Sequence, residues 1–247
     1  MTPPIDRFSG HASLYAQFRI DYPDELYDSI GSRVPNPSRA WDCATGNGQV
    51  AGALADRFDQ VDATDISETQ LLLAIKKPNI TYQLSTAEQT PFADHSFDLI
   101  AVAQALHWFD VNAFHQEVRR VAKPNAVLAE WGYGLAQITS DIDPVLIDFY
   151  RNRVGPYWDP QRKHIDAAYT TLPFPFADVE NATFTVRRSW TLDRFLNYLR
   201  TWSAVRQYSH ENEEDPVVAL GAELGERWGT GEREIVFPVF ARIGVVC

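Results

Sequence analysis

Short apolar runs and amphipathic stretches alternate along the chain between residues 39 and 133. The apolar runs predict strands at residues 39–44, 61–65, 79–84, 97–103 and 126–133. The amphipathic stretches between them predict helices at residues 48–58, 67–77 and 110–122. Ser67 and Gln70 form a capping box that opens the second of these helices. Alternation at this pitch predicts an α/β fold in which helices cover a parallel sheet.

The alternation stops after Gly134. Residues 135–178 are rich in aromatic side chains and prolines, and we expect them to form a small inserted cap. Strand character returns at 182–190 and 233–246, a helical stretch covers 191–205, and Pro238 predicts an edge strand or a bulge. We therefore expect a single domain over residues 1–247, divided into N-terminal lid helices (1–38), a ligand-binding core (39–134), the cap (135–178) and C-terminal strands with a helix (179–247).

Composition narrows the classes of protein that this sequence can represent. With 247 residues, 45% hydrophobic and 22% charged, the chain has the composition of an ordinary globular protein. A net charge of −11 argues against nucleic acid as the main partner, because phosphate neutralisation supplies most of that affinity. Neither a signal peptide nor a membrane-spanning run is visible, and the cysteines and histidines lack metal-ligand spacing. We expect a cytoplasmic protein, either a monomer or a homodimer, that binds neither membrane nor metal.

The loop after the first predicted strand carries the clearest chemical signal. Asp42 to Gly48 read D-x-A-x-G-x-G, whereas dinucleotide loops read G-x-G-x-x-G and phosphate loops continue with a lysine. A carboxylate at Asp42 would repel a pyrophosphate but would suit a ligand with a cationic group. Asp65, 23 residues further on, ends the second predicted strand, where an acid can accept both hydroxyls of a ribose.

The loop resembles motif I of the class I methyltransferases that depend on S-adenosylmethionine (SAM), with Ala44 in place of the first glycine. "STAEQTPFADHSFDLIAVAQALHWFD" resembles the stretch from the adenine-binding loop through motif IV of the small-molecule branch. "EVRRVAKPNAVLAEW" resembles the helix, proline turn and fifth strand that follow, and "YAQFRIDYPDEL" resembles the start of trans-aconitate methyltransferase-like proteins. The resemblance implies a Rossmann-like fold with a mostly parallel seven-stranded sheet, SAM as cofactor and S-adenosylhomocysteine as product.

The resemblance also implies a set of cofactor-binding residues. Asp42, Gly46 and Gly48 would hold the methionine part, Asp65 the ribose, and Thr86 with Ala87 the adenine. The full set is Tyr15, Arg19, Asp42, Ala44, Gly46, Gly48, Gln49, Asp65, Ile66, Thr86, Ala87 and Gln104. In the relatives, residues matching Tyr15 and Arg19 close over the methionine end of SAM.

The sequence is less specific about the residues that bind the methyl acceptor than about those that bind the cofactor. His107 is the candidate catalytic base, because a hydroxyl or amine acceptor needs one, although an ionised carboxylate needs none. The predicted acceptor-lining residues are Trp108, Trp131, Tyr133, Tyr157 and Trp158. The basic stretch 151–164 is either a solvated surface of the cap or an anion-binding lid over the acceptor.

These observations predict methyl transfer to a small molecule at oxygen, with a carboxylate as one candidate, by in-line displacement. Three alternatives stay open: a SAM-binding module without catalysis, a methyltransferase acting on proteins, and a nicotinamide-dependent oxidoreductase. Asp42 and the missing third glycine of the dinucleotide motif disfavour the oxidoreductase.

Overall fold

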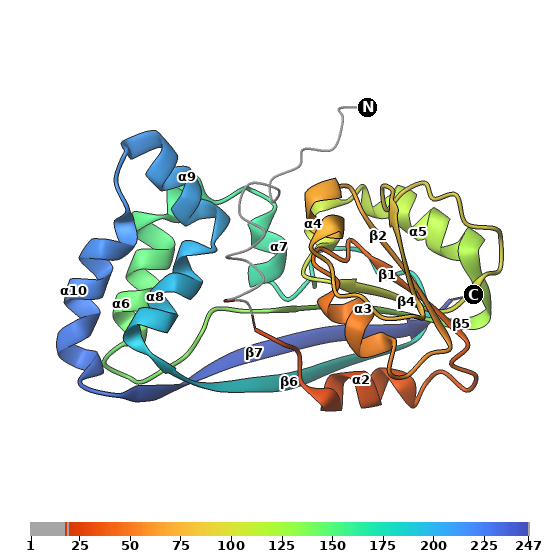
Figure 1. Cartoon of the computed structure of the whole chain (residues 1–247), viewed down its shortest axis with the longest axis horizontal. Helices are drawn as coiled ribbons and strands as arrows, with labels where there is room; N and C mark the ends of the chain where they lie inside the picture. Colours follow the sequence, from red (N-terminus) through yellow and green to blue (C-terminus); the bar gives the residue numbers. More distant parts are fainter. Residues whose placement is uncertain (1–17, 19, 247) are drawn as a thin grey trace.

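Figure 1 shows a computed structural model that describes residues 18 and 20–246. Its seven strands are β1 (Arg39–Cys43), β2 (Gln60–Asp65), β3 (Ile80–Leu84), β4 (Phe97–Ala103), β5 (Ala122–Tyr133), β6 (Ala177–Thr191) and β7 (Glu232–Val245). They form one sheet in the order β3-β2-β1-β4-β5-β7-β6, in which β7 runs antiparallel to both neighbours and the other pairs are parallel. The predicted mostly parallel seven-stranded sheet is confirmed.

Helices cover both faces of this sheet. The first set comprises α2 (Asp24–Gly31), α3 (Gln49–Leu54), α4 (Glu68–Leu72) and α5 (Val111–Val121). Alternate side chains of β4 divide the interior, since Leu99 packs in one apolar cluster with α2 and α3, and Ile100 packs in a second with α5. Burial on both faces explains why the parallel strands are so apolar.

Two helices are shorter than their apolar patterns predicted. Helix α3 ends at Leu54, because the chain must turn to enter β2 at Gln60. Helix α4 begins with the predicted cap, in which the Ser67 side chain accepts the N–H of Gln70, but ends at Leu72. Shortly beyond it the N–H of Ile75 donates to the carbonyl of Asn47, which draws the chain toward the loop after β1.

The prediction that Pro238 marks an edge strand or a bulge is wrong. Strand β7 lies between β5 and β6, and Pro238 sits in regular register opposite Thr185 of β6. Its pairing with β5 begins only at Val239, and the Pro238 carbonyl accepts the N–H of Gly134 beyond the end of β5. Proline is tolerated here because its missing N–H faces the side on which the neighbouring strand has ended.

A second group of helices lies at the far end of β6 and β7, on the left of Figure 1. Residues 135–178 contribute α6 (Asp143–Asp148), the π-helical turn η3 (Phe149–Arg153) and the short turn η4 (Gly155–Tyr157) to this group, whereas α7 (Arg162–Asp166) lies between the group and the sheet in Figure 1. The connection between β6 and β7 contributes α8 (Leu192–Arg200), α9 (Ser203–Asn212) and α10 (Pro216–Trp228), so the predicted helix at 191–205 is split in two. Trp202 links the helices of these two segments, because its ring packs on both Phe149 and Tyr198.

Candidate active site

The candidate site lies along one edge of the sheet. The parallel strands β1, β2, β3 and β4 end at Cys43, Asp65, Leu84 and Ala103, so the loops that follow them emerge at the same edge. The strand order reverses beside β1, which has β2 on one side and β4 on the other. Open α/β sheets bind ligands at such a switch point.

The loop after β1 is held in a left-handed backbone conformation. Ala44, Gly46 and Gly48 have φ values of 58°, 56° and 78°. Two of these positions carry glycine, which adopts this conformation without cost, whereas Ala44 is strained there by about 1–2 kcal/mol. At Gly48 a Cβ atom would also overlap the hydroxyl of Tyr82, which donates to the carbonyl of Ile75 at 2.6 Å.

Asp42 is a buried carboxyl group at the base of this loop, with 1% of its surface exposed. The hydroxyl of Thr45 donates to it at 2.5 Å. Burial raises the pKa of Asp42 to about 7; hydrogen bonds from Thr45 and the Ala51 backbone oppose this rise, and the nearby charge of Asp65 adds to it. The site therefore contains a carboxylate that a bound cation would stabilise.

Asp65 ties two loops together at the end of β2. One carboxylate oxygen accepts the N–H of Gly46 at 2.8 Å and the other accepts the N–H of Ser67 at 2.9 Å. Each carboxylate oxygen can accept further hydrogen bonds. The adjacent Ile66 is 39% exposed, an apolar side chain beside a polar one.

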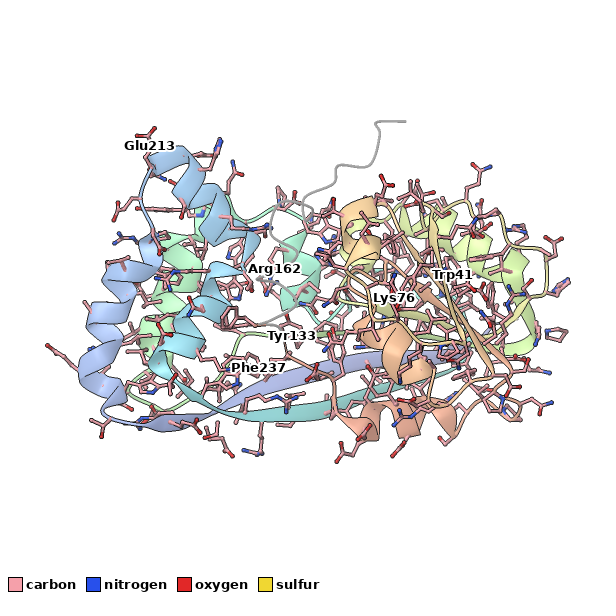
Figure 2. All side chains as sticks on the ribbon, viewed as in Figure 1. Trp41, Lys76, Tyr133, Arg162, Glu213 and Phe237 are labelled. Atoms are coloured by element: carbon pink, nitrogen blue, oxygen red, sulfur yellow. The ribbon has the colours of Figure 1, made fainter. Side chains whose placement is uncertain are left out.

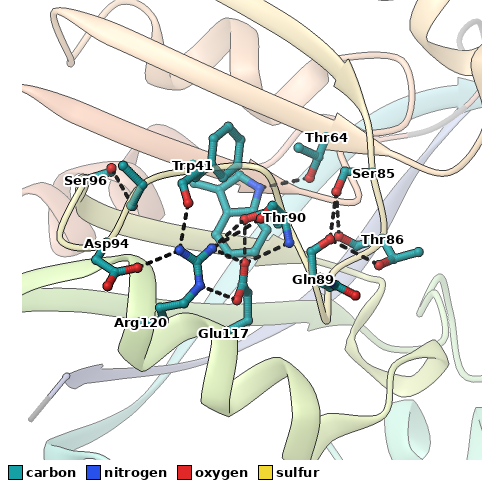
Figure 3. Close-up of polar contacts among 12 residues, drawn as sticks. Trp41, Thr64, Ser85, Thr86, Gln89, Thr90, Asp94, Ser96, Glu117 and Arg120 are labelled. Atoms are coloured by element: carbon teal, nitrogen blue, oxygen red, sulfur yellow. Dashed lines mark hydrogen bonds and ion pairs between the residues drawn. The ribbon is translucent and has the colours of Figure 1, made fainter.

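The loop between β3 and β4 is clamped by two side chains of α5, shown in Figure 3. Arg120 donates to the carbonyl of Phe92 at 2.7 Å and to Asp94 at 2.8 Å. Glu117 accepts from both the N–H and the hydroxyl of Thr90, at 2.8 and 2.5 Å, and pairs with Arg120. The motif reasoning missed these two residues, although opposite charges three positions apart on a helix were a readable signal.

The same loop carries Thr86 and Ala87. The Thr86 hydroxyl lies 3.5 Å from the Gln89 carbonyl, and Ala87 is buried in the cluster with α5. Both residues are thus held at the sheet edge by contacts within their own loop and with α5.

The side chain of Gln104 is hydrogen-bonded to the end of β5. Gln104 has φ 55°, and its side-chain carbonyl accepts the N–H of Tyr133 at 2.8 Å while its amide lies 3.4 Å from the Tyr133 carbonyl. Gln49 plays a comparable part at the start of α3, where its amide donates to Ile20 and Asp21 at 2.8 and 2.5 Å. Tyr15 and Arg19 lie outside the described residues.

His107 sits in the 3₁₀ turn η2 (Leu106–Trp108) that follows β4. It is buried, the centres of its ring and the Trp108 ring lie 4.5 Å apart at a tilt of 41°, and its Nδ1 lies 3.4 Å from the hydroxyl of Tyr169. Burial, with the positive charges of Arg162 and His164, lowers the pKa of His107 to about 3. His107 is therefore a neutral imidazole and a weak base at physiological pH.

The predicted acceptor-lining aromatics separate into two groups. Trp131 is fully buried against Tyr22 and Tyr27, and Tyr157 turns to α9, where it accepts a hydrogen bond from Asn212. Core burial and contacts with α9 account for these positions, and a role of either residue in lining the acceptor stays a prediction. Figure 2 shows Tyr133 and Arg162 between the sheet and the second group of helices, and Trp158 packs on Arg162. Trp108 packs on the ring of His107.

Comparison with known proteins identifies the family. Residues 41–129 match the family described as a methyltransferase domain. A putative methyltransferase from Dictyostelium discoideum is 31% identical over 256 residues, which cover 97% of each chain. The chain belongs to the class I SAM-dependent methyltransferases.

Solved structures agree with this assignment. This methyltransferase superposes on a putative type II methyltransferase from Anaeromyxobacter dehalogenans with a TM-score of 0.86 and 37% identity, covering 93% of this chain and 98% of the other. It shares its fold, with a TM-score of 0.51 and 17% identity over 96% of this chain and 57% of the other, with a phosphoethanolamine N-methyltransferase from Haemonchus contortus in complex with S-adenosylhomocysteine. SAM is the cofactor of this methyltransferase, and the nicotinamide alternative is excluded.

Within the described residues, no helix is both long and apolar enough to cross a membrane. The same part of the chain contains no group of three or more His, Cys, Asp or Glu side chains arranged to hold a metal ion.

Proposed function

We propose that this methyltransferase transfers a methyl group to a carboxylate oxygen of a small molecule, as in the trans-aconitate branch that its sequence resembles. The observation that carries the proposal is that the imidazole of His107, the candidate base in η2, is a weak base. His107 has a pKa of about 3, and burial raises the pKa of both Tyr150 and Tyr169. A hydroxyl or ammonium acceptor must lose a proton, whereas a carboxylate is already ionised at neutral pH.

The cofactor half of the proposal rests on how well the loop residues fit SAM. Asp42 would face the cationic methionine end, and Asp65 at the end of β2 would hold the ribose hydroxyls. Ile66, Thr86 and Ala87 would contact the adenine, while Gln49 and Gln104 would act by fixing the neighbouring backbone. When bound, SAM supplies an electrophilic methyl group on a sulfonium.

His107 has a second role in this proposal, as a hydrogen-bond donor. Tyr169 is fully buried, its hydroxyl is hydrogen-bonded to the backbone of Leu106, and His107 Nδ1 is the one acceptor that the described residues offer to its proton. A neutral imidazole that accepts at Nδ1 carries its hydrogen on Nε2. We infer that this hydrogen donates to the acceptor oxygen and positions it.

The cap and the helices α8 to α10 would then enclose and select the acceptor. Catalysis would come mainly from proximity and in-line alignment of the acceptor oxygen, which can lower a barrier by about 7–11 kcal/mol. We place this reaction in the cytoplasm, on a monomer or a homodimer.

The test compares three acceptors with one skeleton, 3-phenylpropionic acid, 3-phenylpropanol and 3-phenylpropylamine, using SAM labelled in its methyl group. We expect label to enter the acid alone, and homologous acids of shorter and longer chain to extend the comparison. Transfer to the alcohol or the amine in preference to the acid would contradict the carboxylate assignment. Binding of S-adenosylhomocysteine without transfer to any acceptor would favour a SAM-binding module.

A further inference from the structure

Arg162 differs from the other cations of the basic stretch. Residues 151–166 hold four Lys and Arg side chains against two Asp, in a chain whose net charge is −11. Arg151, Arg153 and Lys163 are exposed, whereas the Arg162 side chain retains only 17% of its accessible surface. A solvated cap surface explains the first three residues but not the fourth.

The Arg162 head group is fixed from one side. Its Nε donates to the Tyr150 hydroxyl at 2.9 Å, and its guanidinium carbon lies 4.7 Å from the centre of the Trp158 ring. Asp166 lies 3.6 Å from the same Nε and accepts the Tyr150 hydroxyl at 2.7 Å. Trp202 backs this arrangement by packing on the rings of Tyr150 and Trp158.

The other side of the head group has no partner within the described part of the chain. No hydrogen bond joins either terminal nitrogen of Arg162 to a described residue, and neither is a sealed, buried atom. A guanidinium presents its donors in a planar fork that matches a carboxylate. The packing therefore holds a positive charge in place with its fork available to a ligand.

The position of Arg162 connects it to the candidate site. Helix α7, which begins at Arg162, packs against η2, which carries His107. The charge of Arg162 acts on both His107 and Tyr169. Figure 2 shows Arg162 between the second group of helices and the sheet.

We propose that Arg162 is the residue that recognises the acceptor's anionic group, a carboxylate, at the site described above. This inference rests on the proposed function and adds the residue that selects the substrate's charge. Because Arg162 already occupies the aromatic faces of Trp158 and Tyr150, an amine acceptor would find these cation-binding surfaces filled and a like charge beside them. The same residue thus favours carboxylates and disfavours amines.

The experiment measures binding rather than turnover, with S-adenosylhomocysteine present. The probes are the carboxylates benzoate, 3-phenylpropionate and octanoate, each paired with its neutral amide, titrated by calorimetry. We expect wild-type protein to bind at least one acid at least tenfold more tightly than its amide. Arg162→Gln should abolish that preference, Arg162→Lys should retain part of it, and the exposed control Arg151→Gln should keep it in full.

Equal affinity of the wild-type protein for every acid and its amide, or an unchanged preference in Arg162→Gln, would overturn the proposal. S-adenosylhomocysteine affinity is measured first in each variant, and we expect Arg162→Gln to match wild type, which shows that the variant is folded. A further outcome is an Arg162-dependent preference for carboxylates that the protein does not methylate. That result would support the anion site and refute the proposed function.

Discussion

Asp42 is a residue at which the proposed function opposes stability. Its pKa rises from 3.8 to about 7 on folding, so the folded state binds the proton more tightly than the unfolded state. Wild-type stability from this group is therefore present at low pH and is lost as the pH rises through 7. A bound cation at the methionine end of SAM would reverse this penalty, which is a reason to retain a carboxylate in a buried position.

Asp42→Asn should accordingly stabilise the protein in a pH-dependent way. The amide can still accept from Thr45 but never ionises, so the gain over wild type should be larger at pH 8 than at pH 5 by about 2–3 kcal/mol. Urea unfolding at both values measures this difference. The variant should also lose most of its affinity for SAM, and an equal change in stability at pH 5 and pH 8 would contradict the account.

Ala44 carries the strain that the usual glycine of this motif avoids. Ala44→Gly should stabilise the protein by about 0.5–1 kcal/mol, because relief of left-handed strain of about 1–2 kcal/mol exceeds the added entropy of the unfolded chain. Ala53→Gly, within helix α3, is the matched control and should destabilise by about 1 kcal/mol. Thermal unfolding distinguishes the two, and destabilisation by Ala44→Gly would contradict the strain argument.

At the residue scale, the sequence predicted the loop motif at residues 42–48, but it did not predict the contacts that hold the loop. The spacing of Asp42, Gly46 and Gly48 predicted the loop and its ligand class. That Asp65 would bind the backbone of Gly46, or that Gln104 would bind Tyr133, depended on contacts between segments 19 and 29 residues apart. Sequence spacing does not encode such contacts.

At the scale of elements, α5 supports the loop between β3 and β4 through Arg120 and Glu117. Arg120→Met should free the backbone of residues 90–94, speed hydrogen exchange there, and weaken S-adenosylhomocysteine binding about tenfold, equivalent to about 1.4 kcal/mol. Arg119→Met is the control, since Arg119 donates instead to Pro175. Calorimetry with exchange measurements tests both variants, and equal effects of the two would remove the assigned role.

Strands β1 to β4 were predicted closely because their signal is local burial, whereas β5 and β6 begin four and five residues before their predicted starts. The run at 97–103 matches β4 residue for residue, and β1, β2 and β3 agree to within one residue at each end. Helix α4 ends before its predicted end because the N–H of Ile75 donates to the carbonyl of Asn47. The apolar pattern of the helix does not predict this contact. Helix α10 was not predicted from the sequence.

Across the whole molecule, a buried ion pair joins the sheet to the cap. Glu130 of β5 and Arg242 of β7 pair at 2.7 Å with almost no exposure, and His115 adds a contact to Glu130 at 3.2 Å. Arg242 also donates to the carbonyls of Tyr169 and Leu172 at 2.8 Å. The pair therefore fixes the cap segment whose Tyr169 contacts His107.

Arg242→Met should leave Glu130 buried without its strongest partner and destabilise the protein by about 3–5 kcal/mol. The matched control is Arg187→Met, which breaks the 2.7 Å pair between Arg187 and Glu234 on the neighbouring strands β6 and β7. Both partners there are at least 60% exposed, so the expected loss is below about 1 kcal/mol. Urea unfolding that found equal losses would contradict the role given to burial.

The arrangement of the parts was only partly predictable. Alternation of strands and helices predicted the fold class, and the break after Gly134 coincides with the end of β5 at Tyr133. The joining of α6 with α8 to α10 into one group of helices depends on aromatic contacts across more than 40 residues, such as Phe149 with Trp202. Residues 135–178 alone therefore do not account for the second group of helices.

The central claim is that the methyl group goes to a carboxylate. Its most direct test is the alkali lability of the product formed from a metabolite extract, with SAM labelled in its methyl group and the purified protein. A methyl ester releases its label as methanol in mild alkali, and the account predicts that nearly all protein-dependent label behaves in this way. Label that stays bound through alkali treatment would show an ether, amine or carbon acceptor and would contradict the account.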